Sequence, residues 1–163
     1  MEGLHFMKKF LTILLISTLL LSTNLAEAKA ASATIMPTEI EHISDEYYIE
    51  TIIIEEATSN TLATTKTKTA SKISNITNSN GTVVATFKVT GTFTYDGSTS
   101  KCTAVSHSST INNSSWAFTY RNSSRLTNRA IGHFIAECTQ SGTVVQTVSD
   151  SVILTCAPDG TLS

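Results

Sequence analysis

Residues 80–97 read NGTVVATFKVTGTFTYDG, and this stretch decides the fold. From Val83 to Tyr95 the odd positions are apolar or glycine, whereas most even positions are threonine. Successive side chains of a strand point to opposite faces, so this period of two predicts a strand with one buried face. The Asn-Gly before it and the Asp-Gly after it are typical of tight hairpin turns. Gly91, inside the strand, indicates either a bulge or the close approach of another backbone.

The alternation continues on both sides of this strand. Strands are expected at about residues 64–77 and 98–107, and with the strand at about 82–95 they would form a meander. A further strand is expected from an alternating aromatic set, Trp116, Phe118 and Tyr120.

Two more strands complete the pattern near the C-terminus. The strand at residues 129–138 has one face made of Ala130, Gly132, Phe134, Ala136 and Cys138. A Ser-Gly turn leads into the last strand, whose expected inward positions are Val144, Val148, Val152, Leu154 and Cys156. Six to seven such strands predict an all-β fold for residues 64–163. We expect either a single small sandwich with Greek-key, immunoglobulin-like links or a barrel.

Residues 1–30 carry the pattern of a secretory signal peptide. Lys8 and Lys9 precede an apolar run at residues 10–21, and small residues follow at the end of the segment. The run has 12 residues, whereas a membrane-spanning helix needs roughly 20. We therefore expect cleavage after Ala28 or Ala30. The product would be secreted and extracellular, with no stable membrane anchor after cleavage.

Charge divides the rest of the chain. Residues 31–65 contain seven acids and no lysine or arginine, whereas residues 66–163 contain eight bases and four acids. Apolar residues lie among the acids and include the β-branched run at 52–54, which argues against pure disorder. We assign residues 31–63 to an acidic leader. It is either a solvated linker or a propeptide-like arm that docks on the basic domain, with a cleavable joint at residues 58–65.

The chain contains three cysteines, which cannot all pair within one chain. A bridge between Cys102 and Cys156 would join the end of the chain to its middle. A bridge between Cys138 and Cys156 would link neighbouring strands. Both pairings are open on this argument, and Cys138 is otherwise either a buried apolar residue or a thiol for intermolecular pairing.

Three segments carry a resemblance to known proteins: residues 81–102, the Ser-Ser-Trp at 114–116, and the closing LTCAPDGTL at 154–162. They resemble a group of short secreted β-rich proteins of unknown function from Gram-positive anaerobic bacteria. The resemblance implies export, a β domain and a bridge between Cys102 and Cys156. It implies no catalytic or binding residue.

The sequence contains no pattern typical of catalysis or of a cofactor. There is no Gly-x-Ser-x-Gly motif, phosphate-binding loop or dinucleotide fingerprint. The spacing of His107, His133 and Cys138 matches no close-spaced zinc pattern. We expect no enzyme, no metal site and no cofactor.

A contact region is the function that the sequence favours. Arg121 and Arg125 recur at a spacing of four, near Trp116 and Tyr120. These four are our candidate ligand-contact residues, and a solvated loop is the alternative interpretation. An excess of four positive charges in residues 66–163 is weak for a nucleic-acid partner.

We therefore expect a secreted, non-catalytic binding or surface-interaction module. Its partner would be a cell-wall polymer, a glycan or another protein. The alternative is a secreted effector, toxin-like or antimicrobial, that is activated by removal of the acidic leader.

Overall fold

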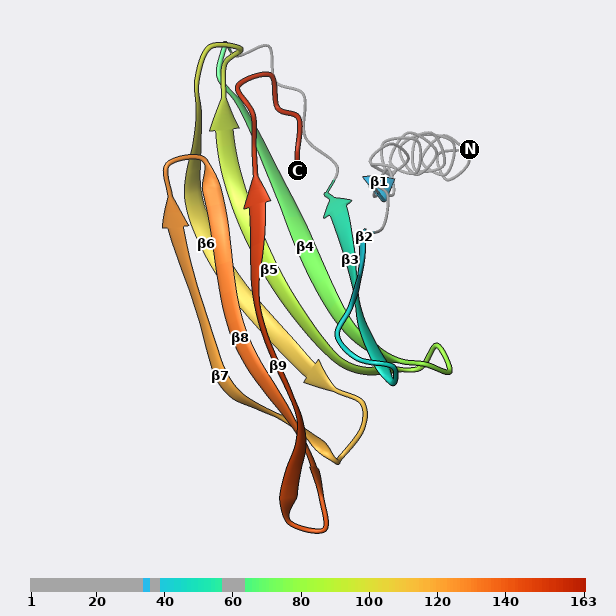
Figure 1. Ribbon diagram of the computed structural model, residues 1–163. Coiled ribbons are helices and arrows are strands. Elements are labelled where there is room, and N and C mark those ends of the chain that lie inside the picture. The colour runs from blue at the N-terminus through green and yellow to red at the C-terminus, as the bar shows by residue number, and fades with distance from the viewer. Residues whose placement is uncertain (1–33, 36–38, 57–63) are drawn as a thin grey trace, which may run out of the picture. The chain divides into compact units, whose positions relative to one another are not determined.

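The computed structural model describes residues 34–35, 39–56 and 64–163, and the expected signal peptide lies outside them. These residues form strands and no helix, so they contain no helix that would span a membrane (Figure 1). The larger sheet contains β1 (Thr34–Ile35), β2 (Glu39–His42), β3 (Tyr47–Glu55), β4 (Lys66–Asn78), β5 (Val83–Tyr95) and β6 (Ser100–Ile111). The smaller sheet contains β7 (Trp116–Leu126), β8 (Arg129–Gln140) and β9 (Thr143–Thr155).

The expected sandwich is confirmed. Its two sheets pack face to face, with β7 against β6 and β9 against β4 and β5. The strands form two separate sheets rather than one closed sheet. Six strands, β4 to β9, lie in residues 64–163, within the expected range.

The links between strands differ from the expected Greek-key pattern. From β3 to β6, and again from β7 to β9, strands that are adjacent in sequence pair antiparallel, so both runs are meanders. Tight turns enforce this order, because they leave no length of chain for a crossover. Gly97 and Gly142 have φ values of +89° and +79° in two of these turns, a backbone region that favours glycine.

The core lies between β5 of the larger sheet and β8 of the smaller one. Phe87 and Phe134 are both buried, with ring centroids 5.0 Å apart. The inward positions expected on β8 are confirmed, as are those on β5 from Ala85 to Phe93. At the start of β5 the register with β4 shifts, and Val84 is buried whereas Val83 is only half-buried. Val144, expected to face inward, is instead 48% exposed. The register of β8 and β9 shifts between Cys138 and Thr139, which breaks the alternation before it reaches Val144.

Two glycines allow the sheets to approach closely. A Cβ added to Gly91 would lie 2.8 Å from the Cβ of Ala130, and one added to Gly132 would lie 2.6 Å from Cε1 of Phe87. Both distances are shorter than carbon atoms tolerate. Gly91 therefore makes room for the side chains of Phe93 and Ala130 rather than for another backbone, and Gly132 is its counterpart on β8.

We expect Gly132→Ala to destabilise the protein by roughly 1–3 kcal/mol, because it overpacks a filled core. Urea unfolding measures this cost. Shortening the opposing ring with Phe87→Leu should recover part of the cost, so that the two substitutions are less than additive.

Gly81→Ala provides the control for this prediction. Gly81 has a φ of +79° and open space around its added Cβ, so its substitution should cost free energy through backbone strain alone. That cost should be unchanged by Phe87→Leu. The packing explanation for Gly132 would be contradicted if the costs of Gly132→Ala and Phe87→Leu simply added, as those of Gly81→Ala and Phe87→Leu should.

The acidic segment contributes a strand to the larger sheet. β3 pairs with β4 from Tyr47–Asn78 to Glu55–Ala70, and Ile49 and Ile53 are buried in the core. The β-branched run explains why this segment is extended although it is acidic. Most of the expected cleavable joint at residues 58–65 lies outside the described residues.

An ion pair joins this strand to the rest of the domain. Lys68 Nζ lies 2.8 Å from Oε1 of Glu55 and donates to the carbonyl oxygen of Gly160 at 2.7 Å. It also lies 5.4 Å from the centroid of the Tyr95 ring. Lys68 is buried, and a buried charge needs such partners. This lysine therefore connects β3, β4 and the C-terminal segment.

Candidate functional site

The four candidate contact residues do not form one surface. Trp116 is only 3% exposed and packs edge-on against Tyr47, with ring centroids 5.1 Å apart. It is therefore a core residue and not a surface contact. Its Nε1 is buried and has no hydrogen-bond partner among the described residues.

A bulge in β7 lies just before Tyr120 and Arg121. The register of β7 and β8 shifts between Phe118 and Tyr120. Beyond the shift Arg121 pairs with Phe134, whose side chain faces the core. Tyr120, its neighbour, points to the outer face and is 48% exposed. The expected alternation of Trp116 and Tyr120 on one face is wrong for this reason.

After the bulge, side chains join β7 to β6 across the open edge of the sandwich. Arg121 Nη1 donates to Oγ of Ser109 at 2.9 Å. His107 Nδ1 lies 2.9 Å from Oγ of Ser123. We call this cluster the arginine seam, and its members are Arg121, Ser123 and Arg125 of β7 with Thr103, His107 and Ser109 of β6.

Both arginines of the seam are exposed. Arg125 Nη1 donates to the carbonyl oxygen of Thr103. Each guanidinium has five donors, so most of them stay available. Within the described residues the only ion pair within 4.0 Å joins Lys68 and Glu55, so no carboxylate neutralises either arginine. Four positions apart on one strand face, the arginines are separated by roughly 13 Å.

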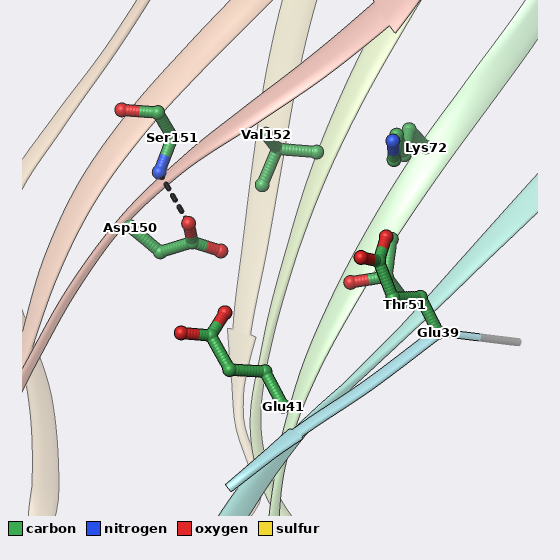
Figure 2. Close-up of a pocket in the computed structure, with 7 residues that line it drawn as sticks. All are labelled: Glu39, Glu41, Thr51, Lys72, Asp150, Ser151 and Val152. Atoms are coloured by element: carbon green, nitrogen blue, oxygen red, sulfur yellow. Dashed lines mark hydrogen bonds between the residues drawn. The ribbon is translucent and has the colours of Figure 1, made fainter. Parts of the chain in front are cut away.

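The opposite edge of the sandwich contains a hollow of about 190 Å³ between β2 and β9 (Figure 2). Its lining residues are Glu39, Glu41, Thr51, Lys72, Asp150, Ser151 and Val152. The carboxylates of Glu41 and Asp150 point toward one another across it (Figure 2). Asp150 accepts a hydrogen bond from the backbone N–H of Ser151 at 2.6 Å. We call this hollow the acidic groove, because three carboxylates and one lysine line it.

The structure places no metal centre in the part of the chain that it describes. No group of three or more His, Cys, Asp or Glu side chains there is arranged to hold a metal ion. His107 and His133 each lie within hydrogen-bond distance of a serine on a neighbouring strand, Ser123 and Ser151 respectively.

The three cysteines are buried and unpaired in the structure. The backbone N–H groups of Cys102 and Cys156 donate to the adjacent carbonyl oxygens of Thr127 and Asn128, at 2.8 and 3.1 Å. These two cysteines therefore flank the same turn. Burial raises the pKa of both thiols, and it outweighs the positive charges of Arg125 near Cys102 and of Lys68 near Cys156, which lower the pKa.

Cys138 lies at the other end of the smaller sheet. It pairs with Gln146, whereas Cys156 directly follows the pair of Arg129 and Thr155. Nine residues of β8 separate these two ladder positions, a length of roughly 30 Å. A disulfide requires Cα atoms within about 7 Å, so the alternative bridge between Cys138 and Cys156 does not fit this fold.

No protein-family model, curated protein or solved structure matches the chain. The fold and the candidate site therefore identify only the class of protein. The protein is a small all-β sandwich with an arginine seam on one open edge and an acidic groove on the other.

Proposed function

We propose that the protein is a secreted, non-catalytic binding module that holds an anionic partner at its arginine seam. One observation carries the proposal: Arg121 and Arg125 are exposed on one strand face and have no carboxylate partner among the described residues. Contacts with β6 already restrict both side chains, which lowers the entropy lost on binding. An anionic wall polymer, an acidic glycan or an acidic protein surface would each fit this chemistry.

Replacing both seam arginines should remove this binding. With Arg121→Ala plus Arg125→Ala we expect the apparent dissociation constant for a polyphosphate-coated resin to rise roughly tenfold or more, because two charge-assisted contacts are lost. Binding of the native protein should weaken as salt rises, since exposed charges are screened. Retention measured across a salt series tests both expectations.

Arg129→Ala is the matched control. Arg129 is also exposed, but its neighbour Ala130 faces the core, so Arg129 points to the outer face of the smaller sheet. It should leave retention nearly unchanged. If Arg129→Ala lost as much retention as Arg121→Ala alone, which removes the same charge, attraction by net charge would explain the binding and the proposal would fail.

Export leads us to propose a second feature, a disulfide between Cys102 and Cys156. Two thiols would lose two protons and two electrons to a disulfide-bearing oxidant outside the cytoplasm and form one S–S bond. The support is their shared burial beside the turn at Thr127 and Asn128. Cys138 would remain a buried thiol.

The alternative function, an effector activated by loss of the acidic leader, has less support. Loss of residues 31–63 would remove β3, with Ile49 and Ile53 from the core and Glu55 from its ion pair with Lys68. The remaining domain would lose packing rather than simply uncover a site.

A further inference from the structure

The two open edges of the sandwich carry complementary features. The arginine seam on β6 and β7 has uncompensated positive charge, and the acidic groove beside β9 contains Glu39, Glu41 and Asp150. Within the described residues, β7 and β9 each pair with β8 alone, so each leaves one backbone edge unpaired. Unpaired strand edges are surfaces on which other chains readily dock.

Exposed apolar side chains gather on the same edges. In the described part of the chain the large exposed hydrophobic residues are Ile40 on β2, Ile111 on β6, Tyr120 and Leu126 on β7, and Val144 and Val145 on β9. Leu126 and Ile40 are 59% and 57% exposed. Ile40 lies between Glu39 and Glu41 on β2, whereas Tyr120 and Leu126 lie on the face of β7 opposite to the seam arginines.

The strand register aligns Arg121 of the arginine seam with Asp150 of the acidic groove. Phe134 of β8 pairs with Arg121 on one side and with Asp150 on the other. Arg121 and Asp150 therefore occupy the same row and the same face of the smaller sheet, at its two edges. A second copy displaced sideways, without sliding along the strands, brings its Arg121 level with Asp150 of the first.

We infer that the anionic partner of the arginine seam is the acidic groove of a second copy of this chain. The inference rests on the proposed function, because it names the partner of the same seam. The contact joins two different surfaces, so each bound copy leaves one seam and one groove free. Association of this kind is open-ended and produces chains of molecules rather than closed dimers.

Charge exchange tests the inference. We expect the full mature protein to self-associate with rising concentration at low salt, as measured by sedimentation velocity. Arg121→Glu and Asp150→Lys should each raise the apparent dissociation constant roughly tenfold or more, because each places like charges opposite one another. A one-to-one mixture of these two variants should associate again, since each variant then meets its opposite charge.

Controls with the same charge change keep the experiment interpretable. Arg129→Glu and Glu137→Lys lie on β8 and outside both edges, so they should associate like the native protein. Restored association in the mixture also shows that both edge variants are folded. A native protein that stays monomeric, or a mixture that fails to associate, would overturn the inference.

The two proposals can fail separately. Asp150→Lys leaves the seam intact, so this variant should lose self-association yet keep its retention on the polyphosphate resin. If it keeps both, the second copy is not the partner, and the binding function of the seam still stands. If Arg121→Ala with Arg125→Ala changes neither measurement, the proposed function itself is wrong.

Discussion

A chain without residues 39–56 should fail to reach the native fold. The deletion removes the buried Ile49 and Ile53 and exposes the core positions that they cover on β4, including Ile76. Each buried isoleucine contributes roughly 1.5–3 kcal/mol, against a total stability of about 5–15 kcal/mol for a domain. The deletion also leaves Lys68 buried without its carboxylate. Loss of a cooperative unfolding transition is the expected result.

Restoring the strand in trans separates this explanation from a general folding defect. A synthetic peptide of residues 39–56, added to the truncated chain, should recover the cooperative transition, because it can pair with β4 in the native register. A truncated chain that unfolds cooperatively at the native midpoint would show instead that the acidic segment is a dispensable leader.

Removing the charge of Glu55 alone tests how much its ion pair with Lys68 contributes to stability. Glu55→Gln should lower the free energy of unfolding by about 2 kcal/mol, because it leaves a buried ammonium without its counter-charge. Glu55 is partly exposed, so the cost should fall below that of a fully buried pair. Glu56→Gln is the control, since Glu56 is the exposed neighbour and makes no ion pair with any described residue.

Sequence periodicity was sufficient to predict β5 and β8, where apolar and other residues alternate over most of the strand, and turn residues helped to place the strands around them. It failed where the register shifts. Tyr120 lies just after one bulge and Val144 just before another, and the extra residue of a bulge reverses the alternation between its two sides. Nothing in the local sequence marks either bulge. For the same reason, the sequence could not predict the face of β7 on which Arg121 lies.

Charge alone did not indicate that β3 is a partly buried strand of the larger sheet. A segment with acids and no bases is typical of a linker, and the buried role of Ile49 and Ile53 became visible only through their pairing with β4. The acidic groove was also beyond sequence reasoning. Glu41 and Asp150 are more than a hundred residues apart, and only the packing of the two sheets brings them together.

Formation of the proposed bridge between Cys102 and Cys156 should have a large effect on stability. The loop between Cys102 and Cys156 contains 53 residues, and in the chain-entropy model a bridge across such a loop contributes roughly 4 kcal/mol. Adding a reductant to protein recovered from culture medium should therefore shift its urea midpoint sharply downward. The non-reduced mass of that protein should be two hydrogens below the reduced value.

The substitutions Cys102→Ser and Cys138→Ser show which of these two cysteines takes part in the bridge. Cys102→Ser should make the midpoint insensitive to reductant, whereas Cys138→Ser should keep the full difference between oxidised and reduced protein. Burial raises the pKa of both bridging thiols, so little thiolate is present in the folded reduced protein and oxidation should follow transient opening. Added denaturant below the midpoint should then accelerate bridge formation. A reduced mass from the culture medium, or a bridge that survives Cys102→Ser, would contradict the pairing.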